Sequence, residues 1–293
     1  MNSRSVNYYY IDVFTSQRFQ GNPLAVFPWA QNLDDLTMQL IAREIGFSET
    51  VFVLPSTHPD CAVRLRIFTP NTELPFAGHP TLGAAMVLDH LGLMPGGEGL
   101  VEEGVGPIKV WKHEERWAML QPSPKPGPIW ERTDLLARLL GLAQAELDHR
   151  YDCQTWGSGL DFLYVPLISR QALSRARIQP AVLEEALSQV SLPPLYLLVD
   201  QDGVVHSRMF APQLGVGEDS ATGSAAGPLC AYLGASGLRE TDSTGWIRTK
   251  IIQGEDMGRR SEIYAQARYY GQGWDQPTVS GSGVIVSQGV FFL

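Results

Sequence analysis

An internal repeat is the feature that most constrains how this chain of 293 residues can fold. Residues 66–71 and 208–213 share arginine, phenylalanine and proline at their first, third and fifth positions. Further along, Gly78-His79 before a pair of alanines resembles Gly223-Ser224 before another pair. Each copy has the pattern of a strand, a loop and a buried helix. The repeat predicts two related halves.

In the first copy we expect a strand over 64–69, a loop over 70–80 and a buried helix over 81–91. In the second copy, residues 217–224 lead into a similar helix. The first N–H groups of a helix have no intrahelical partners and carry the positive end of its dipole. Both helix starts are therefore candidate sites for a carboxylate or an oxyanion.

A proline-rich stretch, residues 121–128, indicates where the halves meet. It resists both helix and central strand, so it suits a crossing between lobes. We predict an N-terminal lobe of residues 1–121, completed by the C-terminal strand 279–293. The C-terminal lobe is expected to contain residues 122–278.

Local patterns place an acidic residue, Glu49, where a helix passes into a strand. Apolar residues recur at helical spacing after Asp34, and Gly46 is a plausible C-cap, so a helix is expected between them. The apolar run 51–54 then predicts a strand. A polar side chain at such a junction can face a cleft.

Charge and composition exclude several classes of function. The net charge is -9, from 22 Lys and Arg against 31 Asp and Glu, so we expect no nucleic-acid partner. No apolar run is long enough to span a bilayer, and we expect a cytoplasmic location without membrane association. Motifs for nucleotide binding or a serine nucleophile are missing, so no cofactor is expected.

The chain has three widely spaced cysteines, Cys61, Cys153 and Cys230. We expect them to be buried free thiols rather than metal ligands.

Three side chains can move or orient protons: Glu49, His79 and Asp219. A dry cleft raises the pKa of a carboxyl group toward neutrality, which permits acid–base chemistry without a cofactor. Structural alternatives remain open, since Glu49 can be a surface residue, His79 a turn residue and Asp219 a helix cap. Four other carboxylates are interpreted as solvated: Glu102, Glu103, Glu114 and Glu115.

Four motifs in this order resemble those of the PhzF-like family. They are residues 12–15 with Gly21-Asn22-Pro23, residues 47–50, residues 76–81 and residues 217–224. The resemblance implies an α+β fold of two pseudo-symmetric, diaminopimelate-epimerase-like lobes. Each lobe wraps a curved, mainly antiparallel sheet around a central helix, and the active site lies between the lobes.

The resemblance also implies an activity and a set of site residues. The best-known member of the family isomerises trans-2,3-dihydro-3-hydroxyanthranilate, moving a proton from C3 to C1 through an acidic residue. By this resemblance, Glu49 occupies the position of that acidic residue. His79 and Asp219 are implied as catalytic partners. The implied substrate contacts are Asn22, Gly78, Thr222, Gly223 and Ser224. A homodimer acting on a small carboxylated substrate is expected.

Two departures from related patterns bear on the reaction. Epimerases of this fold commonly carry a cysteine at each helix entry, but the chain has Gly78-His79 and Thr222-Gly223 there. Ser220 also stands where members of the family often have proline, a change that loosens the backbone beside Asp219.

The leading hypothesis is a cofactor-independent isomerase. The alternatives are an amino-acid-type epimerase with other acid–base groups and a catalytically silent protein that binds a metabolite or a partner.

Overall fold

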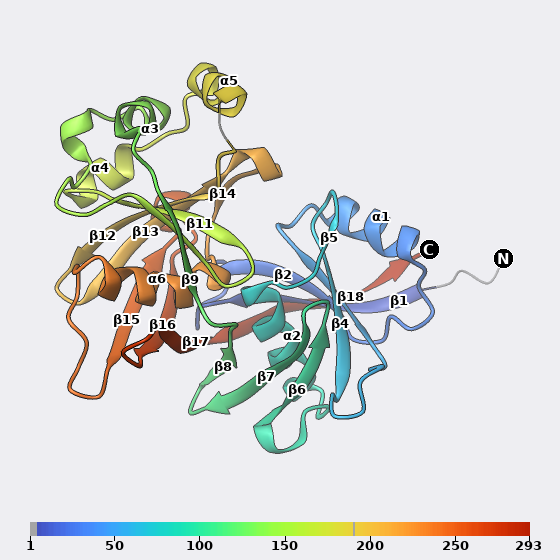
Figure 1. Cartoon of the computed structure of the whole chain (residues 1–293). Coiled ribbons are helices and arrows are strands. Elements are labelled where there is room, and N and C mark those ends of the chain that lie inside the picture. Colours follow the sequence, from blue (N-terminus) through green and yellow to red (C-terminus); the bar gives the residue numbers. More distant parts are fainter. Residues whose placement is uncertain (1–4, 190) are drawn as a thin grey trace. The chain divides into compact units, whose positions relative to one another are not determined.

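The computed structural model describes residues 5–189 and 191–293, and the chain divides into two compact units. The first contains Met1–Leu120 and Val279–Leu293, and the second contains Gln121–Thr278. Strand β17 (Trp274–Gly281) carries the chain from the second unit back into the first (Figure 1).

The first unit is a sheet with the strand order β18, β1, β2, β3, β4, β6, β7, β8. Only the β2–β3 and β4–β6 pairs in this order are parallel. The strands are β1 (Ser5–Val13), β2 (Asn22–Phe27), β3 (Thr50–Leu54), β4 (Val63–Phe68), β5 (Glu73–Leu74), β6 (Glu98–Glu103), β7 (Gly106–His113), β8 (Arg116–Leu120) and β18 (Gly283–Phe292). The helices are α1 (Asp35–Ile45) and α2 (Gly78–His90), with a short 3-10 turn at Pro95–Gly97.

The second unit repeats this plan in the strand order β9, β10, β11, β12, β13, β15, β16. Its strands are β9 (Lys125–Ile129), β10 (Gln154–Gly157), β11 (Asp161–Pro166), β12 (Leu195–Gln201), β13 (Val204–Ala211), β14 (Val216–Asp219), β15 (Trp246–Gln253) and β16 (Ser261–Tyr269). Its helices are α3 (Thr133–Leu140), α4 (Arg170–Arg175), α5 (Pro180–Gln189) and α6 (Gly223–Ala235). Short 3-10 turns lie at Gln144–Glu146, Pro212–Leu214 and Glu255–Met257.

Strand pairing confirms the duplication that the sequence predicts. From β1 to β7 the successive pairs are antiparallel, parallel, antiparallel, parallel and antiparallel. The pairs from β10 to β16 follow the same series. Helices α2 and α6 follow the equivalent short strands β5 and β14, and each contains 13 residues. The predicted α+β fold of two pseudo-symmetric halves is therefore confirmed.

Each unit encloses one buried central helix. Helix α2 contacts β1, β2, β3, β4, β8 and β18, and α6 contacts β10, β11, β15 and β16 (Figure 1). Small residues allow this close packing, because a Cβ atom on Gly83 of α2 would lie 2.5 Å from the Leu24 side chain. Side chains are thus buried all around α2, as expected for a helix that is apolar on every side.

Local capping sets the bounds of α1 as the sequence predicts. The side chain of Asp34 accepts a hydrogen bond of 2.8 Å from the backbone N–H of Thr37. At the other end, Gly46 adopts a left-handed conformation with φ of 68°. The chain then enters β3 at Thr50, so Glu49 lies in the predicted connection between helix and strand.

One predicted element needs correction. Helix α2 begins at Gly78 rather than at residue 81, because Pro80 lies in the first turn, where a helix needs no backbone N–H donor. The proline-rich stretch 121–128, expected to resist helix and central strand, contributes Lys125–Pro128 to β9, which pairs with β10 at the end of the strand order. An edge strand tolerates proline, because one side of the strand needs no N–H donor for the ladder.

An equivalent arginine clamp precedes the central helix in both units. Arg66 of β4 donates from Nε and Nη2 to Glu73, at 2.7 and 2.6 Å. Arg208 of β13 donates in the same way to Glu218, at 2.7 and 2.8 Å. Each arginine also covers the ring of the phenylalanine two residues later. The repeated motif therefore fixes the hairpin that leads into α2 or α6.

Within the described residues, no helix is both long and apolar enough to cross a membrane. The three cysteine side chains are free and buried. Burial raises the pKa of Cys153 and of Cys230 to about 12, which keeps both thiols protonated.

Candidate active site

Four polar side chains gather at the start of α2 in the first unit. His79, the second residue of α2, places Nε2 3.7 Å from Oε2 of Glu49. Its Nδ1 lies 3.4 Å from Nδ2 of Asn22. The Ser48 hydroxyl donates a hydrogen bond of 3.3 Å to Oδ1 of Asn22. The structure thus brings together three predicted residues, Asn22, Glu49 and His79, and adds Ser48.

Burial sets the protonation of His79. Desolvation lowers its pKa to about 3, although a hydrogen bond with the backbone of Pro23 acts in the opposite direction. The ring is neutral at physiological pH, so its approach to Glu49 is not an ion pair. Among the residues that the structure describes, Nε2 of His79 has no hydrogen-bond partner. Buried polar atoms are rarely left in this state, so a bound substrate group can complete this atom's hydrogen bonding.

The geometry around Glu49 suits proton transfer. Its side chain is 18% exposed and that of His79 is 4% exposed, while Oε2 of Glu49, the atom nearest His79, is itself buried. A carboxylate beside a neutral imidazole can accept a proton and return it. At Ala77, the N-cap of α2, no side chain caps the helix, so the amides of Gly78 and its neighbours can hold an anion.

The remaining predicted site residues lie in the second unit, around the start of α6. Asp219 ends β14, and its Oδ2 accepts a hydrogen bond of 2.7 Å from the hydroxyl of Thr222. Thr222 is the N-cap residue of α6, yet its side chain makes no capping hydrogen bond. Gly223 and Ser224 are the first two residues of α6 and correspond to Gly78 and His79. Asp219 thus contacts the start of α6 through the side chain of Thr222.

The prediction that Glu103 is a solvated carboxylate is wrong. Glu103 ends β6 and is 4% exposed, because β6 lies inside the sheet between β4 and β7. Its Oε1 lies 2.5 Å from the hydroxyl of Thr81 in α2. Burial raises the pKa of Glu103 to about 8, while hydrogen bonds from Thr81 and from the backbone of Ala77 act against this shift.

The raised pKa of Glu103 predicts how stability depends on pH. Between its ordinary value of 4.5 and the folded value of about 8, the folded protein keeps a proton that the unfolded chain releases. The contribution of Glu103 to the free energy of unfolding is fully present below pH 4.5 and is lost as the pH rises toward about 8. Glu103→Gln cannot ionise, so we expect it to gain stability relative to wild type, by up to about 1.4 kcal/mol per pH unit. Urea denaturation between about pH 5 and pH 9 measures the difference.

The neighbouring Glu102 supplies a control of opposite sign. Hydrogen bonds from Thr57 and Ser56 lower its pKa to about 2, so its contribution is present above the ordinary value and is lost in acid. Glu102→Gln should therefore be less stable than wild type at neutral pH, with the gap closing below about pH 4. A Glu103→Gln variant whose stability difference from wild type stays constant across the pH range would contradict the assignment.

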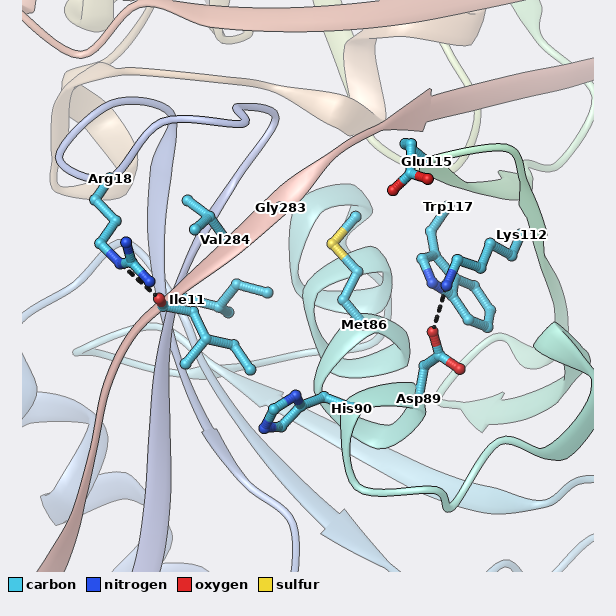
Figure 2. Close-up of a pocket in the computed structure, with 11 residues that line it drawn as sticks. Ile11, Arg18, Met86, Asp89, His90, Lys112, Glu115, Trp117, Gly283 and Val284 are labelled. Carbon is cyan, nitrogen blue, oxygen red and sulfur yellow. Dashed lines mark hydrogen bonds and ion pairs between the residues drawn. The ribbon is translucent and has the colours of Figure 1, made fainter.

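A cavity of about 380 Å³ in the first unit lies at the opposite end of α2 (Figure 2). Figure 2 shows Met86 and His90 of α2 beside it, with Asp89 bonded to Lys112 at 2.9 Å. Its lining lies near the last turn of α2, whereas Glu49 and His79 meet at the first turn. This cavity is therefore separate from the candidate active site.

Within the described parts of the chain, no group of three His, Cys, Asp or Glu side chains is arranged to hold a metal ion.

Two residues at the starts of α2 and α6 were not among the predicted site residues. Ser48 lies within a motif already noted, so its neighbour Glu49 could have pointed to it. Gln253, which contacts Thr222, carries no local signal because it lies 31 residues further along the chain.

The sequence of this chain is similar to those of several known proteins. The profile of the PhzC-PhzF family, described as phenazine biosynthesis-like protein, matches residues 11–289. An uncharacterized isomerase of Mesorhizobium japonicum is 36% identical, with 98% of this chain and 99% of that protein covered. The trans-2,3-dihydro-3-hydroxyanthranilate isomerase of Pseudomonas fluorescens is also 36% identical, with the same coverage.

A solved structure supports the same conclusion. The phenazine biosynthesis protein of Bacillus anthracis, from the PhzF family, superimposes with a TM-score of 0.89 and 25% identity. The match covers 99% of this chain and 100% of that one. With the family profile and the relatives named as isomerases, this likeness shows that the chain belongs to the PhzC-PhzF family of phenazine biosynthesis-like proteins and is an isomerase.

Proposed function

We propose that this isomerase moves a proton within a small carboxylated substrate, with Glu49 as the group that carries the proton. The first substrate to test is trans-2,3-dihydro-3-hydroxyanthranilate, because a 36% identical relative is named for that reaction. Glu49 would remove the proton at C3 and return it at C1. No cofactor enters this scheme.

The observation that carries the proposal is the contact between Glu49 and the neutral, buried His79. A neutral imidazole can accept or donate a hydrogen bond without leaving a charge in the site. It can therefore orient a substrate group while Glu49 changes its protonation state. The amides at Gly78 would hold the substrate carboxylate.

The second unit would contribute to the same reaction through Asp219, with Thr222, Gly223 and Ser224 as substrate contacts. This part of the proposal rests on the family resemblance and on the equivalence of the two helix starts. The homodimer and the cytoplasmic location stay predictions.

An NMR time course in deuterated buffer tests the proposal with the wild-type protein and trans-2,3-dihydro-3-hydroxyanthranilate. We expect the substrate double bonds to rearrange and deuterium to enter at the carbon that receives the proton, to the extent that Glu49 exchanges with solvent. Label confined to one inverted stereocentre would instead indicate an epimerase. No change in the substrate would reject this substrate.

A further inference from the structure

The strands that follow the two central helices end in equivalent ways. Strand β6 ends at Glu103 and strand β15 at Gln253, and a glycine follows each. A Cβ atom on Gly104 would lie 2.8 Å from Pro75, and one on Gly254 would lie 2.7 Å from the carbonyl oxygen of Ser220. Pro75 and Ser220 both stand three residues before their helix. In each unit, the strand end therefore packs against the segment that enters the helix.

Gln253 uses its whole side-chain amide to hold that segment. Its Nε2 donates to the carbonyl oxygen of Asp219 at 2.8 Å and to the hydroxyl of Thr222 at 2.9 Å. Its Oε1 accepts from the backbone N–H of Thr222 at 3.2 Å and from the hydroxyl of Tyr196 at 3.3 Å. Because a backbone N–H can only donate, the contact with Thr222 fixes which amide atom is oxygen.

These bonds determine the direction of the hydroxyl group of Thr222. The hydroxyl receives a hydrogen from Gln253, so its own hydrogen is directed to Oδ2 of Asp219. Gln253 and Thr222 are 0% and 5% exposed, so water does not compete readily for these bonds. The backbone and the carboxylate of Asp219 are thus both held through Gln253.

Glu103 occupies the corresponding place in the first unit. The hydroxyl oxygen of Thr81 lies 2.5 Å from both the carbonyl oxygen of Ala77 and Oε1 of Glu103. An ionised Glu103 has to share the single hydroxyl hydrogen of Thr81 with Ala77, whereas a protonated Glu103 donates its own hydrogen and completes two full hydrogen bonds. A protonated glutamic acid has the shape of glutamine and, like it, offers a donor.

We propose that Gln253 and Glu103 are equivalent positioning residues, which hold Asp219 at the start of α6 and His79 at the start of α2. This inference rests on the proposed function for the roles of Asp219 and His79. Neither residue needs to touch the substrate, since each acts through the segment that it holds.

Steady-state kinetics on trans-2,3-dihydro-3-hydroxyanthranilate test both positions. We expect Gln253→Met and Glu103→Leu to lower kcat by about ten- to a hundredfold while KM changes less, because misplaced groups mainly affect the transition state. Glu103→Gln keeps the shape and a donor, so it should retain most of the wild-type kcat.

Gln154 provides a matched control in the second unit. Its Nε2 donates to Gly127 and its Oε1 accepts from Trp156, both at 3.0 Å, and neither partner belongs to the segment entering α6. Gln154→Met should lower the melting temperature without the loss of kcat. Equal losses of kcat in Gln154→Met and Gln253→Met, or a normal kcat in Gln253→Met, would overturn the inference.

A measurement without substrate separates this inference from the proposed function. In protein labelled with ¹⁵N-glutamine, Asp219→Asn should shift the side-chain amide signals of Gln253 and leave those of Gln154 in place. Unshifted Gln253 signals would overturn the positioning role, even in an active enzyme. Shifted signals in a protein that does not turn over this substrate would support the linkage while rejecting the substrate.

Discussion

Replacing Glu49 by glutamine is expected to abolish turnover of trans-2,3-dihydro-3-hydroxyanthranilate while leaving the protein folded. Glutamine has the same shape but cannot take a proton, and a positioned acid–base group contributes about 10²- to 10⁴-fold to a rate. The side chain of Glu49 is 18% exposed, so the substitution opens no large cavity. Rates are compared by NMR in deuterated buffer, and the fold is checked by circular dichroism and thermal melting.

Glu44→Gln is the control for this change. Glu44 lies on α1, is exposed, and loses the same charge on substitution. It should keep the wild-type rate. A Glu49→Gln variant with an unchanged rate would contradict the assignment of the proton carrier, because glutamine cannot accept the proton that the reaction moves.

Replacing Arg208 by leucine is expected to lower the free energy of unfolding by about 3–5 kcal/mol. The Arg208 side chain is 3% exposed and pairs with Glu218, which is 17% exposed. Its Nη1 also donates to three backbone carbonyls near the end of α4, those of Leu173, Ser174 and Ala176. Leucine would leave a largely buried carboxylate and these carbonyls without a donor. Chemical denaturation measures the effect.

The first unit contains a matched control, Arg66→Leu. Arg66 makes the same two-pronged contact with Glu73 and also bonds Asp35, but these carboxylates are 40% and 84% exposed. Water can solvate both after the arginine is lost, so we expect a loss of only about 0–1 kcal/mol. Equal losses for the two variants would show that burial does not govern the strength of the clamp. Hydrogen exchange then assigns each loss to its unit, because two units need not unfold together.

Features encoded by neighbouring residues could be predicted from the sequence, and α1 is the clearest case. Its cap at Asp34 and its end at Gly46 depend only on residues within one helical turn. The sequence pattern predicts the start of α2 three residues late, because Pro80 fits the end of a loop as well as the first turn of a helix.

Contacts between distant strands explain what the sequence could not predict. Glu103 looked like a solvated residue because its neighbours are polar, yet its position in the sheet buries it. Gln253 lies 31 residues from Thr222, and no periodic pattern links the two. The motifs did place Asn22, Glu49 and His79 together, because each occurs in a short run with its own local pattern. Their catalytic roles stay predictions for the kinetic experiments to test.

The route of β17 and β18 has a consequence for synthesis on the ribosome. The second unit is one continuous stretch, Gln121–Thr278, whereas the first needs Val279–Leu293 to complete its sheet. Strand β18 pairs with β1 along its whole length, from Ser5 to Val13. An emerging chain therefore presents β1 without this neighbour until residues 279–293 have been released. Until then, β1 exposes an unpaired edge that is open to mispairing with other strands.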